Sequence, residues 1–406
     1  MVQTGSFQWM KSLNKSVILN KIRTSGPISR AQIAKETKLT PPTVSSIVKE
    51  LIEQGFVKES SLGMSQGGRK PTMLVINSSE FFVIGIDAGP NEMEMILSDL
   101  SGDILYDSLT PITHPINETR FMDMLKTGIR EFLNKYNHLK EKVIGIGVAM
   151  HGVVDVTSGM SLFAPNLNLH DIPLKEQLEA EFSYPVKVEN DARAMALGEA
   201  WFGESGGAHS MMAVNIGRGI GAGMVIDGKL YHGEFDTAGE VGHMTIDIHG
   251  KKCQCGNDGC LQTVASGPAI AEKAVQALEA GEKSVLAEKA QTEDSGITGE
   301  LVYRAALEND ELCVALLEET GRYIGIGLTN LIHVMNPGKI VIGGGVSKAD
   351  RFILPSMKEE IEQRALTSKA KLTDVMVSKL GDRATSLGAV SLVLVELFDP
   401  EVIAAQ

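Results

Sequence analysis

Hydrophobic residues in the first part of the chain recur at helical spacing, and the helices that this spacing predicts are short. A first helix is expected over residues 13–24, with one apolar face made of Leu13, Val17, Ile18 and Ile22. The pair Gly26-Pro27 follows this pattern and is typical of the end of a helix.

Two more helices are predicted from their capping residues. Ser29 and Gln32 have the spacing of a capping box, in which the serine caps a short helix and the glutamine reaches back, with Ile33 and Ala34 facing inward. Thr40 is a good N-cap, and the Pro41-Pro42 pair after it suits a first helical turn. This third helix runs to about Gln54 and buries Val44, Ile47, Val48 and Leu51.

The pattern then changes to that of a β-hairpin. Gly55-Phe-Val begins a strand, the glycine-rich segment 63–68 suits a hairpin tip, and Met73-Leu-Val-Ile76 suits the returning strand. Helix, helix, turn, helix and two strands is the order of a winged helix-turn-helix. Its third helix would present small polar side chains to base edges in a DNA major groove, from Pro41, Pro42, Thr43, Ser45, Ser46 and Lys49. Arg69 and Lys70 would lie along or inside a minor groove, where cations meet a strong negative potential. Such a domain could instead mediate protein contacts.

The rest of the chain alternates strands with helices. Apolar runs predict strands over 82–87, 94–99, 104–107 and 143–149, with a helix over about 117–137. The same pattern recurs, with strands over 211–217, 221–226 and 339–342 and long helices over about 299–335. These elements predict an α/β body of two lobes, each with helices on a sheet. The expected domains are 1–78, 79–200 and 201–406, with the C-terminal helix packing back on the first lobe.

Composition and charge narrow the class of protein. No apolar run reaches the roughly 18 residues of a membrane span, and no signal peptide is recognisable, so we expect a cytoplasmic protein. Residues 1–80 hold 11 Lys and Arg against 5 Glu and no Asp, a net charge of +6, while the net charge of the whole chain is −13. A basic end on an acidic body favours DNA binding by that end, although a solvated basic surface would give the same charge.

The chemistry is most specific between residues 239 and 263. The sequence Gly239-Glu-Val-Gly-His-Met is followed by Cys253-Gln-Cys-Gly-Asn-Asp-Gly-Cys260, so three of the chain's four cysteines lie within eight residues. His243, Cys253, Cys255 and Cys260 supply the four ligands of a closed tetrahedral zinc site, which leaves no position for a bound water and predicts a structural zinc ion. The alternative is three small buried apolar residues and an unrelated histidine.

These two segments resemble those of the ROK family of sugar kinases and sugar-responsive repressors. Asn14-Lys, Gly26-Pro-Ile-Ser-Arg30 and Gly67-Gly-Arg-Lys-Pro71 are most similar to its xylose-repressor branch. The resemblance covers nearly the whole chain. It implies a winged helix-turn-helix followed by a two-lobed, actin-like ATPase domain (ribonuclease H-like, the ROK sugar-kinase fold). It also implies a sugar bound in the cleft between the lobes by Asn166, Asn190, Asp191, Glu240, His243 and Gln262. The family commonly has Glu at the position of Gln262.

The resemblance also bears on catalysis. Asp191 matches the general base of ROK kinases, whose first phosphate loop has the pattern Asp-x-Gly-Gly-Thr-Lys. The corresponding run here is Asp87-Ala-Gly89-Pro90-Asn91-Glu92, in which Pro90 removes a backbone donor and Glu92 repels a triphosphate. Arg218 replaces the usual Thr of the second loop. We therefore expect no bound ATP and no kinase activity, with Asp191 a vestigial base.

These observations together predict a sugar-responsive repressor. Its expected partners are a palindromic operator in double-stranded DNA, bound by a homodimer or a dimer of dimers, and a monosaccharide inducer. Xylose, glucose and N-acetylglucosamine stay open as inducers, and some repressors of the family respond instead to a sugar-transport protein. The alternative function is an ATP-dependent sugar kinase, of glucokinase or hexokinase type, with a DNA-binding head.

Overall fold

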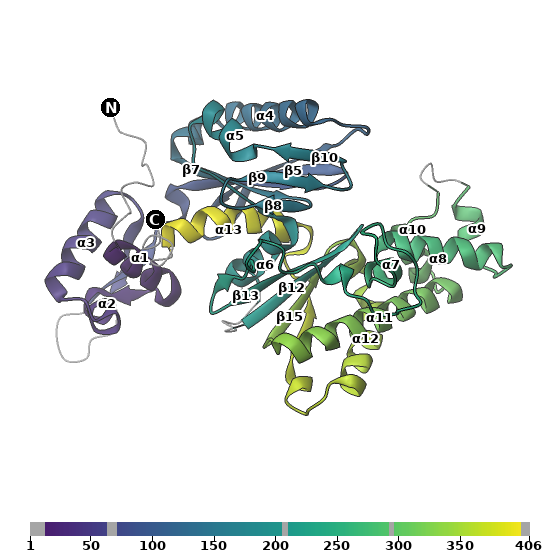
Figure 1. The fold of residues 1–406 in the computed structure, drawn as a ribbon. Helices are drawn as coiled ribbons and strands as arrows, with labels where there is room; N and C mark the ends of the chain where they lie inside the picture. The colour runs from purple at the N-terminus through teal and green to yellow at the C-terminus, as the bar shows by residue number, and fades with distance from the viewer. Residues whose placement is uncertain (1–12, 63–70, 205–209, 292–295, 399–406) are drawn as a thin grey trace. The chain divides into compact units, whose positions relative to one another are not determined.

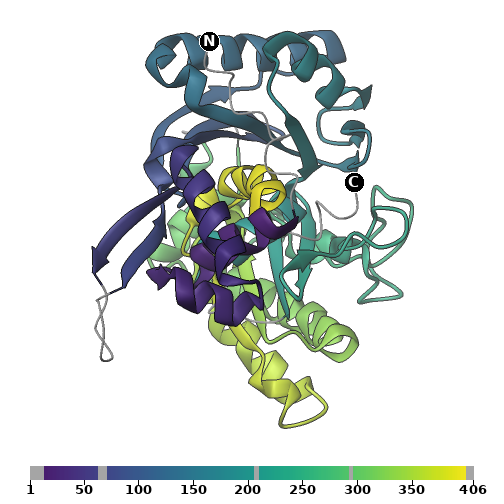
Figure 2. The ribbon, with the colours of Figure 1, turned by 90° about the vertical axis from the view of Figure 1, so that its left-hand side faces the viewer.

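A computed structural model describes residues 13–62, 71–204, 210–291 and 296–398. The N-terminal part combines three helices, which Figure 1 labels α1, α2 and α3, with a small antiparallel sheet of order β1-β3-β2. Its elements are α1 (Leu13–Ser25), β1 (Ile28–Ser29), α2 (Arg30–Thr37), α3 (Pro41–Glu53), β2 (Val57–Leu62) and β3 (Thr72–Ile76). Figure 2 shows the antiparallel pair β2–β3 extending away from the helices. This confirms the winged helix-turn-helix order, to which the structure adds the short strand β1.

Two local predictions in this region need correction. The buried side chains of α1 are Ser16, Ile18, Leu19 and Ile22, whereas Val17 is half-buried and Leu13 is 49% exposed. Leu13 is the first residue of the helix. Ser29 caps α2 by accepting a hydrogen bond from the backbone N–H of Gln32 at 3.2 Å, but the Gln32 side chain donates to Glu36 at 2.8 Å. The serine half of the predicted capping box is therefore present.

The helix α3 forms as its sequence predicts. Thr40 caps it, with its hydroxyl oxygen accepting from the backbone N–H of Thr43 at 3.4 Å, and prolines occupy the first two helical positions. Its inward face buries Val44, Val48 and Leu51, whereas Ile47, which was also predicted to be buried, is half-buried. The opposite face is left exposed to solvent.

The chain after residue 76 contains two sheets, and contacts within the chain define two compact units, Met1–Asp191 with Ser386–Gln406, and Ala192–Thr385. The sheet of the first unit has the order β11-β7-β4-β5-β6. Its strands are β4 (Phe82–Ala88), β5 (Glu92–Asp99), β6 (Ile104–Pro111), β7 (Val143–Met150) and β11 (Val186–Asn190). The helices α4 (Glu118–Lys135) and α5 (Leu174–Phe182) belong to this unit, as does a second sheet that was not predicted, formed by β8 (Val153–Asp155), β9 (Met160–Ala164) and β10 (Leu169–Ile172).

The C-terminal helix α13 (Ala384–Phe398) packs on the first unit's five-stranded sheet. A Cβ atom on Gly147 of β7 would lie 1.8 Å from the carbonyl oxygen of Ala389, so only glycine allows the helix to approach the strand this closely. On α4, the buried side chains of Phe121, Leu125 and Ile129 contribute to the same hydrophobic core as β4, β5 and β7.

The sheet of the second unit repeats this strand order, as β14-β13-β12-β15-β16. Its strands are β12 (Ser210–Ile216), β13 (Ile220–Ile226), β14 (Lys229–Leu230), β15 (Lys339–Gly343) and β16 (Asp374–Val377). In both units the first strand is central, antiparallel to the second and parallel to the fourth. This repeat is the duplicated ribonuclease H-like arrangement of actin-like ATPases.

Helices complete the second unit. They are α6 (Asp191–Phe202), α7 (Gln262–Ala265), α8 (Gly267–Glu279), α9 (Leu286–Lys289), α10 (Gly299–Leu307), α11 (Glu311–Met335) and α12 (Asp350–Arg364). Leu317, Ile324 and Leu328 of α11 share a hydrophobic core with Ile353 and Met357 of α12. Among the described residues, no helix is both long enough and apolar enough to cross a membrane.

Candidate functional site

Four potential metal ligands converge in the second unit. His243 ends a short 3-10 helix (Val241–His243), and Cys253, Cys255 and Cys260 lie in the loop that leads into α7. Their nearest ligand atoms all lie within 4.8 Å of one another. The Sγ of Cys253 is 3.7 Å from the Nδ1 of His243, and the Sγ of Cys255 is 3.7 Å from that of Cys260.

These separations suit one tetrahedral zinc ion. Zn–S bonds of about 2.3 Å at tetrahedral angles place sulfur ligands about 3.8 Å apart, whereas a disulfide would bring the sulfurs to about 2.05 Å. The loop reaches this geometry through glycines with positive φ, Gly256 at +98° and Gly259 at +68°. A Cβ on Gly259 would lie 1.5 Å from the carbonyl oxygen of Asp247. The predicted role of glycine in folding this loop therefore has a specific steric reason.

The thiols of the cluster differ in acidity. Burial raises the pKa of Cys253, but hydrogen bonds with Cys255, His243 and Cys260 outweigh it and bring the value down to about 7. Burial, followed by hydrogen bonds with the other two cysteines, raises the pKa of Cys260 to about 12. Since thiolates rather than thiols bind zinc, an ion at this site would displace the protons that the cluster retains at neutral pH.

Gln262, the residue after Cys260-Leu261, lies beside this cluster. Its side-chain Nε2 donates to the Sγ of Cys253 at 3.4 Å. Its Oε1 approaches the turn between β12 and β13, where a Cβ on Gly219 would lie 3.4 Å away. The side chain that the sequence assigned to a sugar therefore contacts a cysteine of the candidate metal site.

A second polar cluster lies in the first unit, where three strands end. Asn190 ends β11 and Asp191 begins α6, while His151 follows β7 and Asn166 lies between β9 and β10. His151 connects them, because its Nε2 is 2.7 Å from the Asn166 amide nitrogen and its Nδ1 is 3.4 Å from the Asp191 carboxylate. Asn190 donates from its amide to Asp191 at 2.9 Å and to the Gly152 carbonyl at 2.8 Å.

Asp87 is the next-to-last residue of the neighbouring strand β4. Burial, and then the negative charges of Asp191, Glu94 and Glu92, raise the pKa of Asp87 well above its ordinary value. The turn after it carries Pro90, whose carbonyl oxygen is 2.9 Å from the Nε2 of His114.

Sequence reasoning identified three members of the first unit's cluster, Asn166, Asn190 and Asp191, but missed His151. The position of His151 in the chain could have identified it. The strands β4, β7 and β11 are parallel, so the residues at and after their carboxyl ends gather at one edge of the sheet. Asp87 is next to the last residue of β4, and Asp191 directly follows β11. His151 follows the apolar strand β7 directly.

The remaining predicted residues of the second unit are more exposed. Glu240 is an exposed residue at the start of the 3-10 helix that carries His243, so it lies near the metal ligands in the chain. Arg218 is also exposed, in the turn whose Gly217 N–H donates to the Gly219 carbonyl at 2.9 Å.

The predicted DNA-contacting residues lie mainly on the solvent-exposed face of α3. Thr43 is half-buried, with its hydroxyl 2.8 Å from that of Thr40, and the others are exposed, namely Pro41, Pro42, Ser45, Ser46 and Lys49. Arg69 and Lys70 lie outside the described residues.

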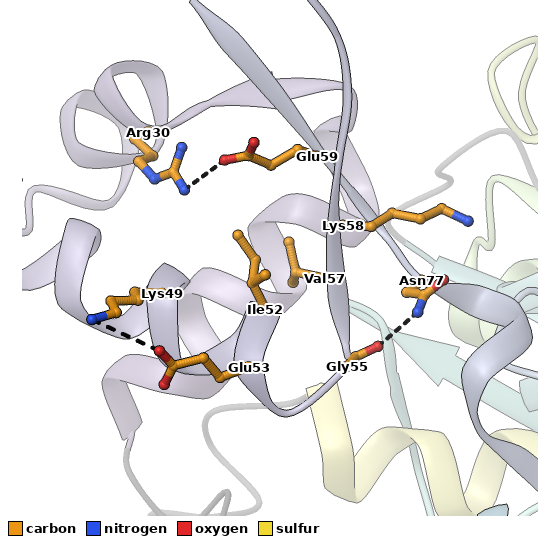
Figure 3. Close-up of a pocket in the computed structure, with 9 residues that line it drawn as sticks. All are labelled: Arg30, Lys49, Ile52, Glu53, Gly55, Val57, Lys58, Glu59 and Asn77. Atoms are coloured by element: carbon orange, nitrogen blue, oxygen red, sulfur yellow. Dashed lines mark hydrogen bonds and ion pairs between the residues drawn. The ribbon is translucent and has the colours of Figure 1, made fainter.

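A hollow of about 610 Å³ adjoins the end of α3, and Figure 3 shows its lining. Arg30 is paired with Glu59 at 3.1 Å, and Lys49 with Glu53 at 3.8 Å. The remaining lining residues are Ile52, Gly55, Val57, Lys58 and Asn77. Since both acidic side chains pair with cations, the hollow is a mixed-charge surface next to the exposed face of α3.

Comparison with known sequences matches two family profiles, the ROK family over residues 83–396 and the MarR family over residues 11–61. The xylose repressor of Caldicellulosiruptor bescii is 33% identical over 393 residues, covering 97% of this chain and 98% of its own. The N-acetylglucosamine repressor of Escherichia coli O157:H7 is 32% identical over 391 residues, covering 96% and 94%.

Two solved structures show how the similarity divides along the chain. A ROK family transcriptional regulator described as a homologue of the E. coli MLC protein aligns with a TM-score of 0.85 and 32% identity, covering 97% of this chain and 98% of that one. A ROK family glucokinase from Streptomyces griseus, solved with glucose and AMPPNP, aligns with a TM-score of 0.69 and 29% identity. The glucokinase alignment covers 98% of that enzyme but only 77% of this chain.

Proposed function

The chain belongs to the ROK family, and from this membership we propose that it is a sugar-responsive, DNA-binding transcriptional repressor of carbohydrate-utilisation genes. One observation carries the proposal. The regulator structure covers 97% of the chain, whereas the glucokinase structure covers 77% and so lacks a counterpart for nearly a quarter of it. The match to the MarR profile over residues 11–61 indicates that a helix-turn-helix head accounts for much of this difference.

The inducer in this proposal is a monosaccharide that is bound without being phosphorylated. Its ligands are Asn166, Asn190 and Asp191 from the first unit and Glu240, His243 and Gln262 from the second. Carboxylates, amides and an imidazole satisfy the donors and acceptors of sugar hydroxyls with directional hydrogen bonds. Names of related proteins support xylose and N-acetylglucosamine as the first sugars to test.

The proposal includes no ATP and no phosphoryl transfer. Pro90 cannot donate a backbone hydrogen bond to a phosphate, and Glu92 brings a negative charge to the start of β5. A zinc ion held by His243, Cys253, Cys255 and Cys260 would have a structural role, because all four ligands come from the protein.

On the DNA side, we propose that a homodimer or a dimer of dimers places two α3 helices on palindromic half-sites about one helical turn apart. Arg69 and Lys70 remain proposed contacts to a minor groove. We expect the protein to act in the cytoplasm, where a reducing environment keeps its cysteines available to bind zinc. A sugar-transport protein is a second class of effector to test.

The test uses the purified full-length protein and duplexes that it selects from a random-sequence library. We expect the selected duplexes to be palindromic, and one of xylose, glucose and N-acetylglucosamine to weaken their binding in fluorescence anisotropy. We also expect no ADP when that sugar is supplied with Mg-ATP. Failure to select any sequence would contradict the repressor assignment.

The alternative is a sugar kinase with a DNA-binding head, which the 29% identity with the glucokinase and the retained Asp191 favour. The ADP measurement separates the two functions. Sugar-dependent ADP release that is lost in Asp191→Asn would establish the kinase.

A further inference from the structure

We propose that His151 is a further residue of the sugar site, and that its imidazole positions Asn166 and Asp191 for the sugar. The inference rests on the proposed function and deepens it. The three side chains come from separate segments, the end of β7, the β9–β10 connection and the start of α6. His151 is the residue that joins them, at 2.7 Å to the Asn166 amide nitrogen and 3.4 Å to the Asp191 carboxylate.

The chemistry of the three groups defines which atom donates each hydrogen bond. An ionised carboxylate can only accept, so the Nδ1 of His151, which faces Asp191, must carry its proton. The Nε2 of a neutral imidazole is then an acceptor, and it meets the amide NH₂ of Asn166. The two contacts are therefore mutually consistent in a single tautomer, Nδ1–H.

This arrangement leaves an acceptor for the ligand. With its NH₂ group turned toward His151, Asn166 keeps its carbonyl Oδ1 for a hydroxyl donor. The Asp191 carboxylate is held by His151 and by the Asn190 amide, which donates at 2.9 Å. Such a site would bind the O–H group of a sugar hydroxyl.

Burial and a further hydrogen bond support a positioning role for His151. The side chains of His151 and Asp191 are 16% and 18% exposed, so each is largely fixed by the protein but still reachable by a small molecule. The next residue, Gly152, accepts a hydrogen bond from the Asn190 amide at 2.8 Å. The turn after β7 thus contacts Asn166, Asn190 and Asp191, the three predicted sugar ligands of this unit.

Substitutions of His151 can separate the effects of its two contacts. His151→Asn places an amide donor near the position of Nδ1 and retains the contact to Asp191, while His151→Gln places a carbonyl near Nε2 and retains the contact to Asn166. His151→Ala removes both. The matched control is His170→Ala, on the neighbouring strand β10, where the ring is exposed and stacks on Phe163 with centroids 4.6 Å apart.

Affinity for the sugar that binds the wild-type protein is measured by isothermal titration calorimetry, after thermal melting and zinc content show that each variant is folded. We expect His151→Ala to weaken binding about tenfold or more. His151→Asn and His151→Gln should each recover part of this loss, and His170→Ala should leave the affinity unchanged. In an Asn166→Ala background, His151→Ala should cost much less than in the wild type, because the two residues act together.

Two results would overturn the inference while leaving the proposed function intact. One is that the wild-type protein binds a sugar and the His151→Ala variant binds it with the same affinity. The other is that the losses of sugar affinity from His151→Ala and Asn166→Ala multiply independently in the double variant, and that His151→Asn and His151→Gln recover none of the affinity lost in His151→Ala. A wild-type protein that binds no sugar would instead overturn the proposed function, and the inference with it.

Discussion

Cys255 is the exposed ligand of the proposed zinc site, while Cys253 and Cys260 are buried. Cys255→Ser would leave three strong ligands, so we expect the purified variant to lose most of its zinc and to melt several degrees below the wild type. Zinc is measured by mass spectrometry and melting by circular dichroism. Cys313, the chain's other cysteine, is buried away from the cluster. Full zinc loss in Cys313→Ser, or full retention in Cys255→Ser, would contradict the ligand set.

Gln262 provides a finer test, because its amide donates to the Sγ of Cys253 at 3.4 Å. A hydrogen bond of this kind stabilises a thiolate ligand and fixes its orientation. We expect Gln262→Met, which keeps the side-chain length and removes the donor, to weaken zinc binding about tenfold in competition with a chelator. Gln254→Met, an exposed position between two of the cysteines, is the control. Equal zinc affinity in both variants would argue that the amide does not support the metal site.

Asp87 gives a prediction about pH. Burial and the charges of Asp191, Glu94 and Glu92 raise its pKa in the folded protein, so the ionised form is disfavoured there relative to the unfolded chain. Stability is therefore lost as the pH rises through the folded pKa, and Asp87→Asn should be more stable than the wild type at neutral pH but not at acid pH. Urea denaturation across a pH series measures this difference.

Asp155 is the opposite case and serves as the control for Asp87. A hydrogen bond from the Ser158 side chain, and then those from the backbones of Ser158 and Thr157, lower its pKa. Its ionised form contributes stability above the unfolded pKa, which is lost as the pH falls through the folded pKa. Asp155→Asn should therefore be less stable than the wild type at neutral pH. The same sign of change in both variants would show that local charge is not the cause.

At the scale of single residues, sequence predicted some partners and missed others. The four candidate metal ligands lie close in the chain, and cysteine spacing is informative on its own. His151 interacts with residues 15 and 40 positions away, and nothing near it in the sequence marks those partners. Gln262 was assigned to a sugar by resemblance, whereas its contact with Cys253 depends on how the loop folds.

At the scale of elements, α3 carries the DNA-binding prediction. Lys49 is exposed and lies 3.8 Å from Glu53, so it can exchange this weak surface pair for a phosphate. We expect Lys49→Ala to weaken operator binding severalfold and to lower the slope of log affinity against log salt by about 1. Lys140→Ala, an exposed lysine outside the helix-turn-helix, should change neither quantity. An unchanged slope in Lys49→Ala would remove Lys49 from the DNA contacts.

Helices with strong periodicity such as α3 and α4 were predicted, whereas α6, α8 and α12 were not, although each has 12 or more residues. Both α3 and α4 have strong apolar faces and side-chain caps, at Thr40 and Asn117, so their sequences specify them locally. The strands β8, β9 and β10 have three to five residues each, and their pairing depends on register with neighbours rather than on their own pattern. Since the connection between β9 and β10 carries Asn166, the unpredicted sheet also positions part of the proposed sugar site.

At the scale of the molecule, the sequence repeats one sheet topology in two units and precedes it with a winged helix-turn-helix. The repeat could be inferred because apolar strands that contain glycines recur in the second half of the chain. The bounds of the second unit could not be inferred from the sequence. The chain enters this unit after Asp191, at the start of α6, and returns to the first unit after Thr385, in α13. Two chain crossings therefore connect the units, one of them directly at a proposed sugar ligand.

This connection motivates the last prediction, which concerns coupling between sugar and operator. If the inducer weakens operator binding by a given factor, thermodynamic linkage requires that the operator weaken sugar binding by the same factor. A sugar shifts the equilibrium only through its different affinities for the two states of the protein. Calorimetric titration of the inducer, with and without a saturating selected duplex, should therefore show a lower sugar affinity with the duplex, and a scrambled duplex of equal length should have no effect. Equal sugar affinities with and without the selected duplex would mean that the sugar does not regulate DNA binding through this protein alone, and would direct attention to a protein effector.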